Sequence, residues 1–163
     1  MLKMIPAIVG LVALAFIVCM VFGPAPRAFA TPQRGPGDPY QRPLDNDQLI
    51  KAVILDEDWD GESVGADGEA GPAQMKPSTW RQYSSERFPY SGAKWREPEA
   101  QRVLRAHASW IRDKMEANNW PETAFTFALV WKAGYSNVKH STYGKSSRDY
   151  AARCQNLYLE LTK

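Results

Sequence analysis

The segment PETAFTFALVWKAG, residues 121–134, predicts a helix that is apolar on almost every side. Seven side chains form this pattern: Ala124, Phe125, Phe127, Ala128, Leu129, Val130 and Trp131. A helix that is apolar all round packs in the centre of a protein, whereas a surface helix has a single apolar stripe. Pro121 is placed to begin the helix and Gly134 to end it, which are positions that these residues favour. We therefore expect a buried central helix.

Amphipathic helices are predicted on either side of this segment. Before it, Pro98 is placed to begin a long helix that ends near residues 118–119. Its apolar stripe consists of Ala100, Val103, Leu104, His107, Ile111 and Met115. After the central segment, Ser147 is placed to cap a closing helix. One face of that helix contains Tyr150, Ala151, Cys154, Leu157, Tyr158 and Leu161.

Another helix is predicted where the folded part of the chain begins. Asp45 and Gln48 fit a capping box, in which the side chains at both positions bond to backbone N–H groups of the first turn. Apolar residues then recur at helical spacing, namely Leu49, Ile50, Val53 and Ile54. We expect this helix to end around residues 58–61. Residues 61–73 contain four glycines and neither helical nor strand periodicity, which predicts a loop or a short hairpin.

The remaining segment gives weaker signals. Pro77 and Ser78 are placed to open a short helix through Ser84, and residues 88–94 are expected to form a loop. Together these patterns predict a mostly α fold. We expect one compact helical domain over residues 45–163, with the glycine-rich loop or small hairpin after its first helix.

The first thirty residues predict export across a membrane. Residues 4–22 carry no charge, and Ala28-Phe29-Ala30 has the small-x-small pattern that a signal peptidase reads. We therefore predict that residues 1–30 are a signal peptide. The alternative is an uncleaved membrane anchor, because 19 helical residues span about 28 Å. Residues 31–44, which are rich in Pro and Gly, are predicted to be an extended linker.

Charge is distributed unevenly along the chain, although its formal net charge is only +2. Residues 1–30 hold two basic residues and no acid, so the rest of the chain has no net charge. That balance argues against nucleic acid as a general partner, because such binding rests on a basic excess. Within the remainder, residues 45–69 sum to −8 and residues 70–163 to +7.

Glu57 is the candidate general acid. It follows Val53 by four positions and Ile54 by three, so it shares the apolar face of the first predicted helix. Apolar surroundings disfavour the charged form of a carboxyl, as a proton donor near neutral pH requires. The alternative interpretation is that Glu57 belongs to a solvated acidic helix end, since further acids surround it.

Four pieces of the sequence, in order, carry a resemblance to a known family. Glu57-Asp58-Trp59 is followed by SVGADGEAGPAQMKPSTW (residues 63–80), then by ALVWKAG (residues 128–134), and finally by Tyr150 with the closing helix. This order resembles the soluble lytic transglycosylase domain of the lysozyme superfamily. In that family an acid at a helix end precedes a glycine-bearing loop, a Gly-Leu-Met-Gln element, a Pro-x-Thr element and an Ala-Tyr-Asn-Ala-Gly helix. The resemblance covers residues 47–161.

The resemblance implies a lysozyme-like fold and a peptidoglycan lytic transglycosylase. Glu57 would protonate the glycosidic oxygen between N-acetylmuramic acid and N-acetylglucosamine, then act as the base while the 6-hydroxyl closes a 1,6-anhydro ring. The spacing from Glu57 to Gly71 is one residue shorter than in the family, so Asp56 is the alternative acid. The implied substrate-binding residues are Gly71, Gln74, Met75, Trp131, Lys132, Gly134 and Tyr150.

The resemblance further implies no cofactor or metal, a monomer, and peptidoglycan strands as the partner, in the periplasm, the cell envelope or outside the cell. The membrane is a partner only if the N-terminal segment stays uncleaved. A lysozyme-type hydrolase is one alternative, and it would need a second acid: Asp60, Glu62, Asp67 or Glu69. A second alternative is a non-catalytic glycan-binding or assembly protein, because Lys132 replaces the asparagine of the family motif. Lys132 could then pair with an acid of residues 56–69. The third is a membrane-anchored helical interaction domain without a glycan ligand.

The chemistry of these residues suits an extended sugar chain. Glycines such as Gly71 allow close approach of the backbone, and the Gln74 amide can both donate and accept hydrogen bonds. Four aromatic residues could stack on sugar rings, of which the first two are favoured as core residues: Trp59, Trp80, Tyr135 and Tyr143. His107 is interpreted as structural, and with Cys154 it gives no zinc-ligand spacing.

Overall fold

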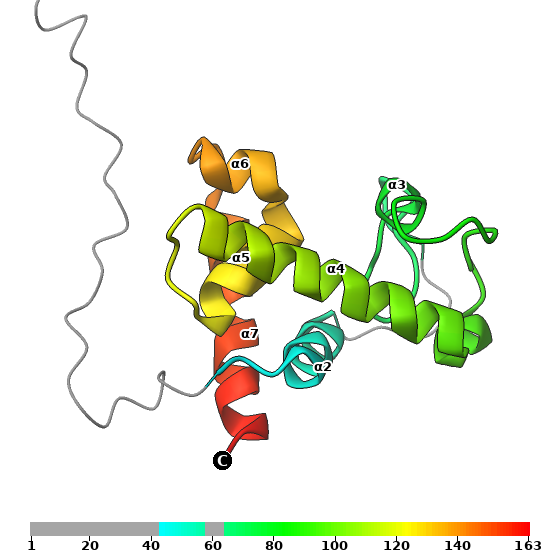
Figure 1. The fold of residues 1–163 in the computed structure, drawn as a ribbon, viewed down its shortest axis with the longest axis horizontal. Coiled ribbons are helices and arrows are strands. Elements are labelled where there is room, and N and C mark those ends of the chain that lie inside the picture. The colour runs from blue at the N-terminus through cyan, green and yellow to red at the C-terminus, as the bar shows by residue number, and fades with distance from the viewer. Residues whose placement is uncertain (1–42, 58–63) are drawn as a thin grey trace, which may run out of the picture. The chain divides into compact units, whose positions relative to one another are not determined.

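The structure, a computed structural model, describes residues 43–57 and 64–163. The predicted signal peptide and nearly all of the predicted linker lie outside these residues, as do Asp58, Trp59, Asp60 and Glu62. The described elements, in chain order, are α2 (Asn46–Asp56), α3 (Pro77–Trp80), the 3-10 helix η2 (Gly92–Arg96), α4 (Pro98–Ala117), α5 (Ala124–Ala133), α6 (Tyr135–Lys139) and α7 (Lys145–Leu161) (Figure 1). The described part contains no strand, only one isolated bridge between Ala70 and Met75. The prediction of a mostly α fold is confirmed.

The central element is α5, as its apolar sequence predicted. Its buried residues are Ala124, Thr126, Phe127, Ala128, Leu129 and Val130. It packs most extensively against α7, and also against α4, α2 and α6. The helix begins at Ala124 rather than at Pro121, because the Thr123 hydroxyl caps it by accepting a hydrogen bond from the Thr126 N–H at 3.1 Å. Gly134 ends it, as predicted, with a positive φ of 83°.

Helix α2 packs against α7 and is fixed at both ends. At its start, the Asp45 carboxylate accepts hydrogen bonds from the Asp47 and Gln48 backbone N–H groups, as the capping box predicted. The return bond from Gln48 is not made, because the Asp45 N–H donates to the Tyr158 hydroxyl of α7 at 3.2 Å instead. At the other end, the helix stops at Asp56, before the predicted residues 58–61, and Glu57 is its C-cap.

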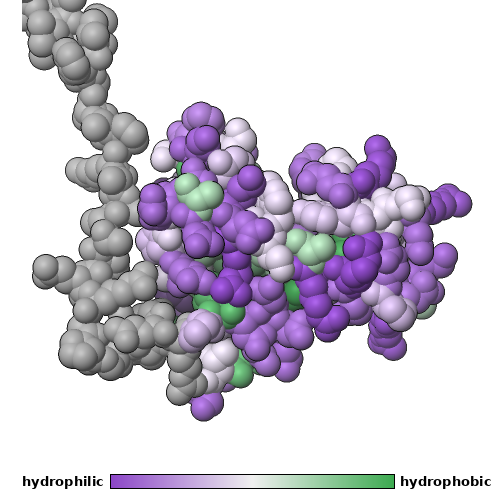
Figure 2. Space-filling model, viewed as in Figure 1, coloured by the Kyte–Doolittle hydropathy of each residue, from purple (hydrophilic) through white to green (hydrophobic). Residues whose placement is uncertain are grey.

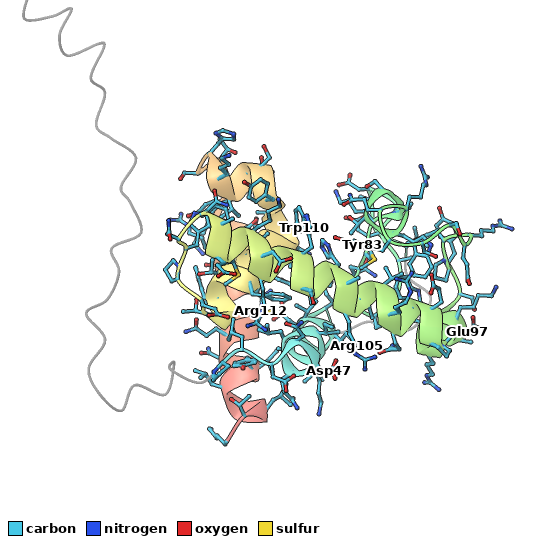
Figure 3. All side chains as sticks on the ribbon, viewed as in Figure 1. Asp47, Tyr83, Glu97, Arg105, Trp110 and Arg112 are labelled. Atoms are coloured by element: carbon cyan, nitrogen blue, oxygen red, sulfur yellow. The ribbon has the colours of Figure 1, made fainter. Side chains whose placement is uncertain are left out.

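Helix α4 begins at Pro98 and ends at Ala117, in agreement with the prediction. Its buried stripe contains Ala108 as well as the predicted residues, while His107 at the edge of the stripe is half-buried. Figure 3 shows Arg105 and Trp110 on opposite sides of this helix, with Arg105 directed toward Asp47 of α2. The Arg105 Nε lies 2.8 Å from a carboxylate oxygen of Asp47.

Several predicted boundaries and elements are wrong. Helix α7 begins at Lys145, two residues before the predicted cap Ser147, and α3 ends at Trp80 rather than Ser84. The loop predicted over residues 88–94 includes the start of η2, and α6 was not predicted at all. Both missed helices are five residues long, too short to develop a periodic pattern.

A buried aromatic cluster holds the segment from α3 to η2 together. The indole ring of Trp80 makes edge contacts with the rings of Phe88 and Trp95, at centroid distances of 6.0 Å and 5.7 Å. The Trp80 Nε1–H also donates to the Glu86 carbonyl at 2.9 Å. Trp80 is therefore a core residue, as predicted, and not a platform for a sugar ring.

The exterior visible in Figure 2 is mainly hydrophilic, with small and separate hydrophobic areas. Among residues 43–57 and 64–163, no helix is both long enough and apolar enough to cross a membrane.

Candidate active site

A cleft of about 390 Å³ lies beside the last turn of α5. Its walls come from the end of α2, the loop of residues 64–76, α3 with the turn after it, α4, α5 and the start of α6. Six of the predicted site residues line it: Glu57, Gln74, Met75, Trp131, Lys132 and Gly134. Gly71 and Tyr150 do not line it. A second cavity, of about 300 Å³, lies between the start of α2 and the end of α7 and contains none of the predicted residues.

Glu57 is a mostly buried carboxyl at the wall of this cleft. Only 12% of its side chain is exposed, so it is not part of a solvated acidic helix end. Its backbone N–H donates to the Val53 carbonyl at 3.1 Å, which fixes the residue to the last turn of α2. The carboxyl combines burial with access to a ligand-sized opening, which is the environment that a general acid or base requires.

Asp56 lies beside Glu57 in sequence but points elsewhere. Its side chain is 4% exposed and accepts two hydrogen bonds from Arg153 of α7, at 2.7 and 3.0 Å. Such a two-point ion pair fixes the orientation of the carboxylate. Asp56 does not line the cleft, so its geometry suits a link between α2 and α7 rather than proton transfer to a ligand.

Lys132, in the last turn of α5, pairs with Glu57. The Lys132 Nζ lies 3.1 Å from one carboxylate oxygen of Glu57 and 3.5 Å from the other. This pairing with an acid of residues 56–69 is the predicted alternative to a role of Lys132 in sugar binding. Lys132 itself is 44% exposed and lies over the Tyr150 ring, 4.9 Å from its centroid.

Tyr150 packs beneath the Lys132 ammonium and does not reach the cleft. It is buried in α7, and no group in the described part of the chain completes a hydrogen bond with its hydroxyl. Burial raises the pKa of Tyr150 far above its usual range, and the nearby Cys154 and Glu57 raise it further. The phenol therefore stays neutral. Burial also raises the pKa of Cys154 to about 12, so this thiol is not a nucleophile at neutral pH.

The glycine-rich loop forms the opposite wall of the cleft. Two backbone hydrogen bonds of 3.0 Å join Ala70 and Met75 in a single isolated bridge, so the segment predicted as a loop or short hairpin is a loop closed by one bridge. Gln74 has a positive φ of 44°, and its Nε2 donates to the Gly71 carbonyl at 3.1 Å. The Trp131 Nε1–H donates to the Ala73 carbonyl at 3.2 Å. Trp131 thereby ties the loop to α5, in addition to lining the cleft.

Gly71 has a packing role and does not line the cleft in which its substrate contact was predicted. A Cβ at this position would lie 2.0 Å from the Cε2 atom of Trp95, and φ is 78°. The residue is buried under the indole ring. Glycine is required here so that the loop can pack on the aromatic cluster.

Two further acids line the cleft, but both are engaged within the loop. Asp67 pairs with Lys76 at 2.6 Å, and this hydrogen bond lowers the pKa of Asp67. The Glu69 carboxylate accepts a hydrogen bond from the Asp67 backbone N–H at 2.9 Å. Neither is placed as clearly as Glu57 to exchange protons with a ligand.

An aromatic wall of the cleft was largely missed from the sequence. The His107 ring stacks on Trp110, with centroids 5.7 Å apart, and contacts Trp131 at 4.9 Å. Burial lowers the pKa of His107 to about 4, so the imidazole is neutral at pH 7. The spacing of His107, Trp110 and Lys114 could have predicted that they share one face of α4, because residues three and four apart lie on the same side of a helix.

The described residues include no group of three or more His, Cys, Asp or Glu side chains that could hold a metal ion.

Comparison with protein-family models, with curated proteins and with solved structures gives no match.

We expect Gly71→Ala to destabilise the protein more than Gly68→Ala. Both glycines have a positive φ, so alanine costs about 1–2 kcal/mol of backbone strain at either site. Only at Gly71 must Trp95 also move, and repacking a core residue adds about 1–3 kcal/mol. Urea unfolding of the two variants measures the difference. Equal losses of stability would show that the Trp95 contact does not constrain the loop.

We expect His107 to make stability depend on acid. Its folded pKa of about 4 lies below the unfolded value of 6.5, so the unfolded chain binds more protons between these pH values. The contribution of neutral His107 to the free energy of unfolding is complete above pH 6.5. It is lost, by up to about 3 kcal/mol, as the pH falls from 6.5 to about 4. Urea unfolding at pH 7 and pH 4.5 should show a smaller acid loss in His107→Gln than in wild type. His140→Gln, at an exposed position, is the control and should lose as much as wild type; an unchanged loss in His107→Gln would contradict the account.

Proposed function

We propose that this chain is an exported enzyme that cleaves the glycan strands of peptidoglycan, a lytic transglycosylase with Glu57 as its single general acid and base. One observation carries the proposal: Glu57 is a mostly buried carboxyl that lines an open cleft, in which Gln74 is a second polar group. Asp56, the alternative acid, is engaged by Arg153 outside that cleft.

In the proposed reaction the proton begins and ends on the Glu57 carboxyl. Glu57 donates it to the glycosidic oxygen between N-acetylmuramic acid and N-acetylglucosamine, and the bond to the leaving sugar breaks. The carboxylate then takes the proton of the 6-hydroxyl group, whose oxygen closes the 1,6-anhydro ring. No water is consumed, so one carboxyl is sufficient, unlike in most glycosidases.

Lys132 has two opposite effects on this cycle. When Glu57 has given up its proton, the ammonium stabilises the carboxylate that remains. Before that step, the same ammonium has to leave so that Glu57 can carry a proton. Its side chain is 44% exposed and has a flexible stem, so it can turn toward solvent.

A lysozyme-like fold is part of the same proposal. The order of elements supports it: an acid at the end of α2, a glycine-rich loop, a long α4, a buried α5 and a closing α7. The motifs that carry the family resemblance fall on these elements in the same order. A hydrolase on this scaffold would use Asp67 or Glu69 to activate water, and both line the cleft.

A non-catalytic glycan-binding protein is the second candidate function. The observation that favours it is the ion pair itself, because Lys132 occupies the carboxylate that would have to act as an acid. In this case the cleft would hold the sugar chain without cleaving it.

We expect the purified chain from Thr31 to release 1,6-anhydro-muramyl products from cell-wall sacculi, as detected by mass spectrometry. Glu57→Gln should lower the rate by about 100-fold or more, since general acid–base catalysis contributes that much. Asp56→Asn is the matched control and should retain activity per folded molecule, with folding checked by circular dichroism.

The products distinguish the alternatives. Products with a free reducing end would indicate a hydrolase, and sacculus binding without products would favour the non-catalytic function. Equal activity of wild type and Glu57→Gln would overturn the assignment of Glu57. If the chain neither binds nor cleaves sacculi, both proposed functions are overturned.

A further inference from the structure

A group of aromatic and basic side chains borders the cleft on the side of α4 and α6. Trp110 of α4 and Tyr135 of α6 line the cleft, and their rings meet edge to face with centroids 5.9 Å apart. Figure 3 shows Trp110 on the side of α4 away from α2. Lys114 Nζ lies 5.6 Å from the centroid of the Trp110 ring and 5.7 Å from that of Tyr135, and Lys139 Nζ lies 5.7 Å from that of Tyr135.

These two cations are not neutralised by carboxylates of the described chain. Seven ion pairs link described residues, and neither Lys114 nor Lys139 belongs to one. The two lysines that line the cleft differ, since Lys76 pairs with Asp67 and Lys132 with Glu57. The positive charge at the α4 and α6 wall is therefore available to a ligand.

The polar groups near the Tyr135 hydroxyl are also donors. The Asn118 Nδ2 donates to this oxygen at 3.4 Å, and together with Lys139 it lowers the pKa of Tyr135. Two ammonium groups therefore lie beside the Trp110 and Tyr135 rings, which line the cleft. The Asn118 amide is already engaged, because it also donates to the Lys114 carbonyl at 2.7 Å. A set of donors and cations beside ring faces fits a ligand with an anionic group attached to an apolar or ring-shaped body.

We propose that Trp110, Lys114, Tyr135 and Lys139 form a subsite that recognises a carboxylate on the sugar chain held in the cleft. The proposal rests on the proposed function and specifies its substrate: an acidic glycan binds, and a neutral one of the same length binds more weakly. In peptidoglycan the carboxylate is either that of the lactyl group of N-acetylmuramic acid or one of the attached stem peptide. On the other walls Lys132 and Lys76 are paired with Glu57 and Asp67, so among the described residues a ligand carboxylate meets lysines that are not ion-paired only at α4 and α6.

The test is calorimetric binding in the Glu57→Gln background, which keeps the glycan intact. Three tetrasaccharide probes are compared: N-acetylglucosamine only, alternating N-acetylglucosamine and N-acetylmuramic acid with free lactyl carboxylates, and the same alternating chain with stem peptides. The double variant Lys114→Gln/Lys139→Gln removes the two cations. Lys51→Gln/Lys94→Gln, at exposed positions outside the cleft, removes the same charge elsewhere and is the matched control.

We expect Lys114→Gln/Lys139→Gln to weaken binding of a carboxylated probe by about tenfold or more at low salt, and the neutral probe by less than twofold. Weakening of only the peptide-bearing probe assigns the carboxylate to the stem, and weakening of the peptide-free alternating probe assigns it to the lactyl group. Equal weakening of all three probes, no weakening, or the same weakening in Lys51→Gln/Lys94→Gln would overturn the subsite.

Cleavage assays separate this proposal from the proposed function. If the chain with Glu57 intact binds carboxylated probes through these lysines but releases no product from sacculi, the subsite stands and the enzymatic function fails. If it cleaves sacculi and Lys114→Gln/Lys139→Gln changes neither affinity nor rate, the enzyme stands and the subsite fails. Binding to none of the three probes would overturn both.

Discussion

The burial of α5 is the constraint on which the rest of the structure depends. Its side chains are apolar on almost every side, so α7, α2 and α4 pack around it and leave only its last turn at the surface. That packing brings the end of α2 to the last turn of α5, where Glu57 meets Lys132 across 75 positions of sequence. The ion pair of Asp56 with Arg153 fixes α2 to α7 at the same point. The candidate site is thus a product of core packing and not of any local motif.

Acidic and basic residues, which are separated along the sequence, also lie on different sides of the cleft. Acids from the segment of residues 45–69, which sums to −8, line the walls made by α2 and the glycine-rich loop. The later segment, which sums to +7, contributes the two unpaired lysines beside α4 and α6. This arrangement would orient a ligand that carries a carboxylate at one place and a bond to be protonated at another. The positive charge of the lysines attracts the carboxylate, both while the ligand approaches and after it has bound.

Sequence patterns predicted the parts of the fold that rest on long periodic segments, and missed the parts set by single contacts. The central helix, the start of α4 at Pro98 and the Gly134 stop follow from periodicity and end preferences. The start of α5 depends on one hydroxyl, that of Thr123, and α6 is too short to leave a pattern. In the site, the inward direction of Glu57 was predictable from spacing. The role of Gly71 was not, because it depends on Trp95 approaching from a distant segment.

A crystal structure of the Glu57→Gln variant with a peptidoglycan tetrasaccharide would show whether a sugar chain binds with its scissile bond at Glu57. We expect a glycosidic oxygen within about 3 Å of the side-chain amide at position 57, with the sugar chain in the cleft beside Trp131. A sugar chain seated elsewhere, such as in the cavity beside Tyr158, would contradict this expectation.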